Sequence, residues 1–383
     1  MTNPHRWCVR IGIATLTIAA ACSSGEQAAP DSTVASRTPP APTTTSTAPT
    51  TSPPASTTSV APTSSAVTTT TLPAIPRQPL TGVPLADGEQ AILRPALAVK
   101  IDNHSAARRN HSGLAVADIV FEEIVEAEIT RFAAVFHSRD SDVVGPIRSG
   151  RSQDVDLLTS FGSPLFAWSG GNAGVTRLIA ESGLTDLNAV RGGEGYYRGP
   201  GPNPHDLYNS TQRLWDQTPI FHPAVPPPQQ FGYLRPGQTF EGEPVGAVAL
   251  PMRSIDVLWS WDAESGRFLR SQEGTPHVDA LHGRIGAENV LVLSTWYRPS
   301  AIDARSPEAQ TITESAPLWV FSNGQMIEGR WYRTDATEPI RLVDADFRPI
   351  ALTPGTTWVE LAEAQFTGDA GAPVTDLTIL PPG

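Results

Sequence analysis

The segment GPIRSGR (145–151) has the residue types and spacing best suited to bind an anion. Its Gly-Pro pair shapes a tight turn, and Ser149 can cap a following helix whose free N–H groups attract negative charge. Arg148 and Arg151 add planar guanidinium groups that suit phosphate or carboxylate. The segment therefore predicts an anion-binding lip at the start of a helix.

Three carboxylates, Asp102, Glu122 and Glu126, lie on or beside neighbouring predicted strands. They could supply a general acid and a general base if burial separates their pKa values. Glu122 and Glu126 would share one face of a strand, roughly 13 Å apart in extended chain. That distance is too great for a glycosidase pair unless the strand bends. The alternative is that the carboxylates only neutralise nearby basic side chains, namely Lys100, Arg131, Arg148 and Arg151.

The segment PHDLY (204–208) contains His205, the one histidine in a motif-like setting. Its imidazole could act as a general base, or it could hold a loop by bonding a backbone carbonyl. His205 joins the three carboxylates as a candidate catalytic residue. The candidate ligand-binding residues are polar side chains at strand and loop ends: Asn103, Arg131, Arg148, Ser149, Arg151 and Tyr208.

Several motifs that would define a reaction are missing from the sequence. The other histidines show no HExxH or similar metal-ligand spacing. There is no Gly-Lys-Ser/Thr string of a nucleotide-binding loop and no G-x-S-x-G serine motif. The sequence therefore predicts neither a metal site nor a cofactor, and it leaves open whether the protein is an enzyme.

Strands and helices that alternate must position these residues. Residues 96–101 form an apolar run that predicts a buried strand, and residues 119–138 predict two strands with a turn near Glu126. Apolar spacing predicts a helix within 149–162 that starts near Ser149 or Ser152, and another over 171–183, with a strand at 164–169 between them. This alternation indicates an α+β or α/β unit.

The composition divides the folded part into two domains. We expect an α+β or α/β N-terminal domain over 80–220 and a Pro/Gly-rich connection over 221–244. Strand-like segments separated by SG, NG and PG turns then predict a mostly β C-terminal domain over 245–370. Residues 371–383 are expected to form a tail.

The first residues predict export and lipid anchoring. Residues 1–22 combine a basic start at Arg6 and Arg10, a short apolar stretch and an Ala run that leads into Cys22. This is similar to a lipoprotein signal peptide, in which Cys22 becomes acylated and anchors the chain to a membrane. The alternative is an ordinary secretory signal that is cut at the Ala run. Residues 23–79 are rich in Thr, Ser, Pro and Ala and predict a disordered stalk.

Charge and cysteine content exclude some functions. The formal net charge is −12, which argues against nucleic acid as a partner, because such binding depends on Lys and Arg neutralising phosphates. The two cysteines, Cys8 and Cys22, both fall in the leader. The folded part therefore has no disulfide and no thiolate metal site.

Four strings in the first half together resemble the YerB-like bacterial lipoproteins: AVKIDN (98–103), GLAVADIVFEEIVEAEITRF (113–132), GPIRSGR (145–151) and PHDLY (204–208). WSWD, ENVLVL, NGQMIEGRW and LTPGTTWVEL extend the resemblance through the second half, so that it covers roughly residues 80–365. The family is a two-part domain of unknown function. The resemblance therefore implies a location and an architecture but no reaction. The family usually has Asn after Pro-His, where this chain has Asp206.

Two hypotheses follow. The first is a non-catalytic, lipid-anchored extracytoplasmic protein that binds an anionic cell-wall ligand or an envelope protein partner beside Arg131, Arg148, Arg151 and His205. The second is a cell-envelope hydrolase that cleaves a saccharide or phosphodiester bond by carboxylate and histidine acid–base catalysis. Both require the acidic and basic groups of the first unit to converge.

Overall fold

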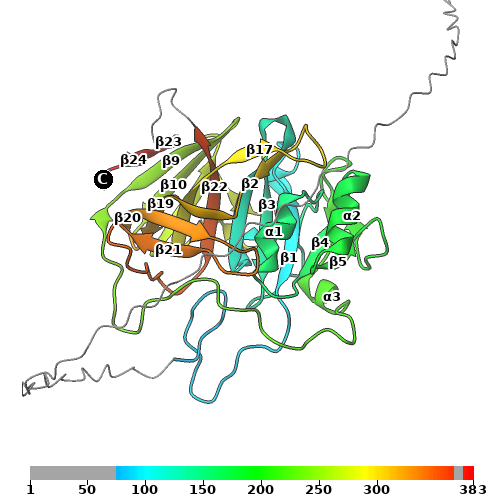
Figure 1. The fold of residues 1–383 in the computed structure, drawn as a ribbon, viewed down its shortest axis with the longest axis horizontal. Helices are drawn as coiled ribbons and strands as arrows, with labels where there is room; N and C mark the ends of the chain where they lie inside the picture. Colours follow the sequence, from blue (N-terminus) through cyan, green and yellow to red (C-terminus); the bar gives the residue numbers. More distant parts are fainter. Residues whose placement is uncertain (1–74, 366–373) are drawn as a thin grey trace, which may run out of the picture. The chain divides into compact units, whose positions relative to one another are not determined.

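One mixed sheet of twelve strands runs through both halves of the chain (Figure 1). The computed structural model describes residues 75–365 and 374–383. Ten strands of this sheet follow one another from edge to edge: β21 (Arg341–Asp344), β20 (Gln325–Arg333), β19 (Thr313–Ser322), β16 (Asn289–Thr295), β22 (Thr357–Gln365), β2 (Ile119–Ile124), β3 (Thr130–Phe136), β1 (Leu97–Asp102), β4 (Leu165–Trp168) and β5 (Thr185–Asn188). The two others, β23 (Val374–Thr375) and β8 (Glu243–Pro244), pair with β22 and β20. The halves of the chain meet where β2 pairs with β22 in parallel.

A second sheet of six strands belongs to the second half of the chain. Its strands are β12 (Thr275–Pro276), β11 (Arg267–Gln272), β10 (Ile255–Asp262), β9 (Ala247–Met252) and β24 (Thr378–Leu380), with β15 (Gly286–Ala287) beside β11. Buried residues of this sheet, such as Trp259 and Phe268, share one hydrophobic core with Val290 and Trp358 of the large sheet. The second half therefore packs as two layers of sheet.

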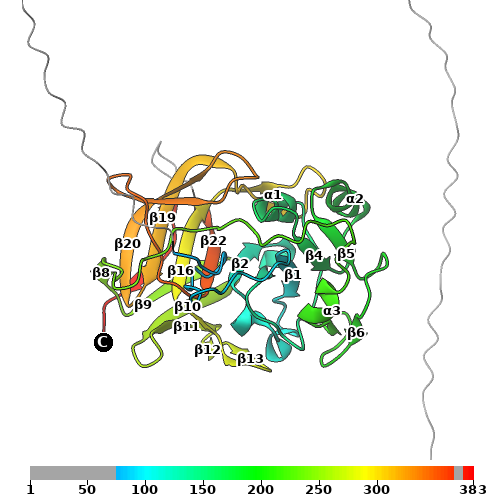
Figure 2. The same ribbon diagram turned by 90° about the horizontal axis from the view of Figure 1, so that it is seen from below.

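Short hairpins and helices complete the described part of the chain. The hairpin strands are β6 (Tyr197–Arg198) with β7 (Leu207–Tyr208), β13 (Val278–Asp279) with β14 (Gly283–Arg284), and β17 (Tyr297–Pro299) with β18 (Pro307–Ala309). The helices are α1 (Gln153–Thr159), α2 (Ala173–Glu181), α3 (Thr211–Trp215) and the 3-10 turns η1 (Arg108–Asn110), η2 (Leu114–Val116) and η3 (Glu126–Glu128). Figure 2 shows α1 and α2 on one side of β4 and β5, and α3 on the other.

Strand alternation decides which charged side chains are buried under which layer. Ala98 of β1 and Phe121 of β2 face the core under α1 and α2. Because side chains alternate along a strand, Lys100 and Glu123 point to that same face. Glu122 points to the opposite face, toward the second sheet. The neighbouring carboxylates of Glu122 and Glu123 therefore lie on opposite faces of the large sheet, the first toward the second sheet and the second toward the helices.

The fold agrees in its coarse form with the sequence prediction. The protein is mostly sheet, the helices α1 to α3 lie in the first half, and the second half is rich in strands. The strands expected at 96–101 and 164–169 are β1 and β4, and those expected within 119–138 are β2 and β3. The segment β4–α2–β5 forms a parallel βαβ unit.

Two boundaries differ from expectation. The residues expected to form a tail contain β24, which pairs with β9 in the second sheet. The Pro/Gly-rich connection buries Phe231, Tyr233 and Phe240 in the core of the large sheet, so it separates two sequence regions but not two compact bodies. The predicted leader with Cys22, and the predicted stalk up to residue 74, lie outside the described residues.

Candidate functional site

Asp102, the last residue of β1, joins two side chains from distant parts of the sequence. Its Oδ2 accepts a hydrogen bond from Nδ1 of His205 at 2.5 Å, and Nε of Arg148 lies 3.2 Å from the same oxygen. Its Oδ1 accepts from the backbone N–H of His104 at 3.0 Å. Only 1% of the Asp102 side chain is exposed. A buried carboxylate therefore orients an imidazole and a guanidinium group.

Backbone pairing explains why these residues meet. Residue 147 bridges Ile101 of β1, and the N–H of Arg148 donates to the carbonyl of Lys100 at 2.9 Å. The N–H of Ile147 donates to the carbonyl of Leu207 at 2.6 Å, which brings the PHDLY segment alongside. The strand end, the GPIRSGR segment and the His205 loop therefore lie side by side.

The environment of Asp102 favours its ionised form. Burial alone would raise the pKa of Asp102. The hydrogen bonds from His205 and from the His104 N–H, together with the charges of Arg131 and Arg148, outweigh burial and lower this pKa. Asp102 is therefore a carboxylate at neutral pH, and Nδ1 of His205 must be the donor in their hydrogen bond.

The outward ends of this cluster have unused hydrogen-bonding capacity. The terminal nitrogens of Arg148 and Nε2 of His205 bond no residue in the described part of the chain, and their side chains are 23% and 14% exposed. The ring of His104 stacks on that of His205, with centroids 4.3 Å apart. Nδ1 of His104 accepts from the Ala106 N–H at 3.2 Å, so the Nε2 of neutral His104 carries the proton. Asp102, Arg148, His104 and His205 together are called the Asp102 cluster below.

Arg131 and Arg151 have a structural role beside this cluster. Both pair with Glu126, through Nη2 of Arg131 at 3.2 Å and Nε of Arg151 at 2.8 Å. They also donate to the backbone carbonyls of Ser149 and Gly150. Burial would raise the pKa of Glu126, but the two guanidinium groups lower it to about 2. The alternative of mutual neutralisation is therefore what the structure shows for Arg151 and Glu126.

The N-terminus of the helix predicted to bind an anion carries carboxylates. The helix begins at Gln153, and its first turn carries Asp154 and Asp156. Asp154 Oδ2 accepts the N–H of Arg151 at 2.6 Å. Ser149 lies before the helix, whose N-cap residue is Ser152, and the carbonyl of Ser149 accepts from Arg131. Carboxylates at this end of the helix would repel an anion.

Three other candidates belong to the scaffold. Glu122 is fully buried, and it accepts from Thr130 Oγ1 at 2.7 Å and from Arg270 Nη2 at 2.6 Å. Asn103 is also fully buried and bonds Thr130 and a glutamine of β11. The hydroxyl of Tyr208 donates to backbone carbonyls, and burial raises its pKa. The polar side-chain atoms of all three bond other residues of the protein, so in this arrangement they stabilise the scaffold.

Sequence reasoning missed a buried polar chain that reaches Asp102 from the second half of the protein. Arg270 of β11 is fully buried and donates from Nη1 to Nδ1 of His277 at 2.8 Å. His277 Nε2 lies 2.8 Å from Nδ1 of His111, and His111 Nε2 lies 2.6 Å from the carbonyl of Asp102. Because a guanidinium group only donates, the proton order is fixed along the chain, and both imidazoles are neutral. Burial lowers the pKa of both, for His111 to about 4.

Two carboxylates share the inner end of this chain. Glu122 and Glu360 are register partners on β2 and β22, and Arg270 is 2.6 Å from the first and 3.9 Å from the second. Burial and the charge of Glu122 raise the pKa of Glu360 well above its usual range. Glu360 is therefore protonated, because one cation does not neutralise two buried carboxylates.

A second buried group lies under α1. Nζ of Lys100 is 2.5 Å from Glu123 Oε1 and 2.7 Å from Asp154 Oδ1, and all three side chains are inaccessible to solvent. Burial and the charge of Asp154 raise the pKa of Glu123 to about 7. This group fixes α1 on the sheet and does not reach the surface.

Within the described residues, no group of three His, Cys, Asp or Glu side chains is placed to hold a metal ion. The helices of residues 75–365 and 374–383 include none that is both long and apolar enough to cross a membrane.

The comparisons with known proteins define the class of protein. Residues 80–222 match the N-terminal domain, and residues 248–359 the C-terminal domain, of a family described as protein of unknown function (DUF3048). The chain belongs to this family of two-part YerB-like proteins.

One curated relative and one solved structure are similar to it. A Bacillus subtilis (strain 168) protein named "Putative lipoprotein YerB" is 27% identical over 300 residues, which is 74% of this chain and 86% of the relative. The crystal structure of YerB protein from Bacillus subtilis matches with a TM-score of 0.64 and 24% identity, over 74% of this chain and 95% of that one. The structural match concerns the fold alone.

Proposed function

We propose that this protein is an extracytoplasmic lipoprotein, anchored to the membrane through Cys22, that binds a phosphate-bearing ligand of the cell envelope at the Asp102 cluster. Similarity to a lipoprotein and the leader sequence support the anchor. The unused donors of the cluster support the binding site.

The free guanidinium fork of Arg148 is the observation that carries the proposal. Its Nε lies 3.2 Å from Oδ2 of Asp102, an ion pair that keeps the group beside the buried carboxylate although the Nε–H makes no hydrogen bond. The terminal nitrogens of Arg148 bond no described residue. A guanidinium group with free terminal nitrogens is suited to bidentate binding of an oxyanion.

Local charge favours an anion although the whole chain is acidic. Arg131, Arg148 and Arg151 lie with two carboxylates, Asp102 and Glu126, which leaves one positive charge in excess. His205 Nε2 and His104 Nε2 add neighbouring polar groups that can donate when protonated. Several donors on different groups suit the tetrahedral oxygens of phosphate better than the two oxygens of a carboxylate.

The test is calorimetric titration of the full-length chain in detergent with propanediol monophosphate. Arg148→Gln should weaken binding at least tenfold, since a charge-assisted hydrogen bond contributes about 1.5–3 kcal/mol. Arg177→Gln is a matched control, because Arg177 is exposed and bonds no described residue. Equal affinity of wild type and Arg148→Gln, with unchanged thermal unfolding, would refute the site.

A second candidate function, phosphodiester hydrolysis, rests on the hydrogen bond between Asp102 and His205. The carboxylate fixes Nδ1 as the donor, which leaves Nε2 facing outward to take a proton. Nε2 would remove a proton from water as its oxygen bonds phosphorus, and would return a proton to the leaving alkoxide as the P–O ester bond breaks. Saccharide cleavage by a carboxylate pair has no such support, because Glu122 and Glu126 are occupied by arginines.

Release of nitrophenolate from bis(p-nitrophenyl) phosphate tests this second function. If it is correct, wild type turns the ester over and His205→Gln loses about 10²–10⁴-fold of that rate. If the wild-type protein binds propanediol monophosphate but does not hydrolyse the ester, binding alone remains as the proposed function.

A further inference from the structure

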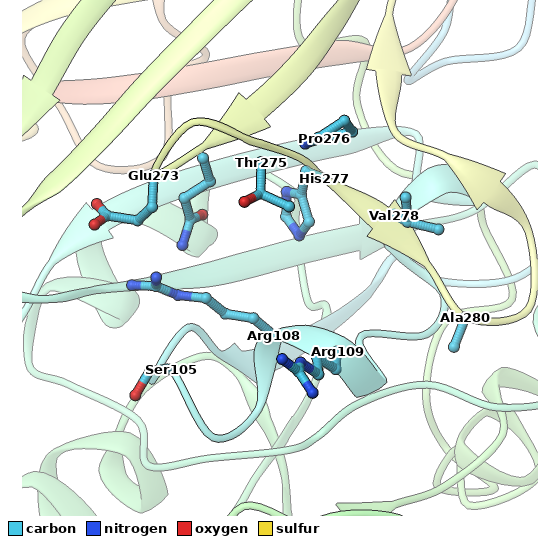
Figure 3. Close-up of a pocket in the computed structure, with 10 residues that line it drawn as sticks. Ser105, Arg108, Arg109, Glu273, Thr275, Pro276, His277, Val278 and Ala280 are labelled. Atoms are coloured by element: carbon cyan, nitrogen blue, oxygen red, sulfur yellow. The ribbon is translucent and has the colours of Figure 1, made fainter.

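A cavity of about 430 Å³ lies beside the Asp102 cluster, between the two halves of the chain (Figure 3). Ser105, Arg108 and Arg109, from the loop and turn after β1, form one wall. Residues 272–280, from the end of β11 to the end of β13, form the other. The volume is within the range of small-molecule sites in proteins, about 300–1,000 Å³.

Two arginines and one carboxylate, that of Glu273, line this cavity. Nε of Arg108 donates to the carbonyl of Asn103 at 3.3 Å, but its terminal nitrogens bond no described residue. Arg109 is exposed and has no partner within the described part of the chain. Figure 3 shows the Arg108 side chain extended along the cavity toward the Glu273 end. Burial lowers the pKa of Arg108 more than the charge of Glu273 raises it, and the two side chains form no ion pair, so the cavity keeps one positive charge in excess.

The opposite wall is largely apolar. Pro276, Val278 and Ala280 line it, with the ring of His277 between them and the polar chain to Asp102. Figure 3 shows these residues across the cavity from the two arginines. A ligand that contacts both walls would combine an anionic group with a carbon segment.

The wall of the cavity adjoins the Asp102 cluster along the chain. Asp102 and His104 of the cluster are followed directly by Ser105 of the cavity wall. Nε of Arg108 lies 3.3 Å from the carbonyl of Asn103, the residue between Asp102 and His104, which places Arg108 close to the cluster in space. Five residues lie between Asp102 and Arg108, so their Cα atoms are at most about 22 Å apart.

We propose that the cavity is a second phosphate subsite, and that the ligand is a chain of at least two phosphodiester groups joined by short carbon units. One phosphate binds Arg148, the next binds Arg108 and Arg109, and the carbon unit lies against Pro276 and Val278. This inference rests on the proposed anion site at Arg148. It adds that the ligand carries repeated phosphate groups, which the site at Arg148 alone does not specify.

The experiment measures affinity against chain length. The full-length protein in detergent is titrated with propanediol phosphate oligomers that carry one, two or four phosphates. Two linked sites should bind the four-phosphate chain at least tenfold more tightly than the single phosphate. Arg108→Gln with Arg109→Gln should remove this gain, so that the variant binds the four-phosphate chain no more tightly than the single phosphate. Arg148→Gln should weaken binding of every chain length.

The control separates a built subsite from general charge attraction. Arg177→Gln with Arg191→Gln removes the same charge from exposed positions that bond no described side chain. This control should keep the full gain with chain length. An equal loss of gain in the control and in the Arg108/Arg109 variant would overturn the inference.

The outcomes distinguish the two proposals. Single-phosphate binding that depends on Arg148 but shows no gain with length refutes the second subsite and leaves the proposed function standing. If Arg148→Gln leaves the affinity for the single phosphate unchanged, both the proposed function and the second subsite are refuted. Tetraglutamate that binds as tightly as the four-phosphate chain overturns the phosphodiester assignment, since it offers the same number of side-chain charges without phosphate.

Discussion

Replacing Arg270 by Met should destabilise the protein strongly, because this residue neutralises the buried carboxylate of Glu122 between the two sheets. Arg270 is fully buried, and Nη2 lies 2.6 Å from Glu122 Oε2. Removing one partner of a buried pair leaves the other charge uncompensated, at a cost of about 3–5 kcal/mol in the free energy of unfolding. The same change leaves Nδ1 of His277 without its donor.

The loss should grow with pH. Without Arg270, the buried carboxylate of Glu122 has no cation beside it, and an uncompensated buried charge becomes more costly as pH rises above the usual carboxyl pKa of about 4.3. Groups with raised pKa contribute stability that is complete below the unfolded pKa and is lost as pH rises through the folded pKa. The variant should therefore lose stability between about pH 5 and 8 more steeply than wild type does.

Urea unfolding of the full-length chain, followed by circular dichroism at pH 5.5, 7 and 8.5, measures this loss. Arg341→Met on β21 is the control, because its side chain is 58% exposed and should matter by less than about 1 kcal/mol. Adding Glu122→Gln to Arg270→Met should recover part of the stability and flatten its pH dependence. A loss below about 1 kcal/mol that is constant with pH would refute the reasoning.

Three further predictions concern single side chains. Burial and Asp154 raise the pKa of Glu123 to about 7, so its contribution is complete below about pH 4.5 and is lost as pH rises through 7. Glu123→Gln should make the melting temperature less dependent on pH between about pH 4.5 and 7. Arg131 and Arg151 lower the pKa of Glu126 to about 2 against the effect of burial, so its contribution is present above about pH 4.5 and is lost toward pH 2. Glu126→Gln should lower the melting temperature at pH 7 and have little effect at pH 2; the reverse order would contradict the assignment. Cys22→Ser should move the chain from the membrane fraction to the soluble fraction, and retention of the variant in membranes would exclude acylation as the anchor.

Local patterns predicted most of the first half of the fold. The apolar run of β1 and the alternation of β2 and β3 identify these strands, because each pattern depends only on neighbouring residues. The parallel pairing of β2 with β22 could not be predicted, since it joins segments far apart in the sequence. Strand β24 was missed because three residues before a Pro-Pro pair carry too little periodicity.

Part of the site could also be predicted from local patterns in the sequence. Asp102, Arg148 and His205 lie at strand and loop ends, where polar side chains often have functional roles. Arg270 was missed because a charged residue is seldom buried, although alternation with Phe268 on β11 places it on the inner face. Of the two helix starts that the sequence allowed, the structure has the one at Ser152, where Asp154 accepts from the Arg151 N–H, a contact that depends on where the chain turns.

The most direct test of the anion site is a crystal structure of the protein soaked with tungstate, a heavy tetrahedral oxyanion whose anomalous signal locates it without ambiguity. The account predicts one strong site within hydrogen-bond distance of the terminal nitrogens of Arg148, beside Nε2 of His205. Tungstate bound only elsewhere, with the Arg148 fork unoccupied at saturating concentration, would contradict it.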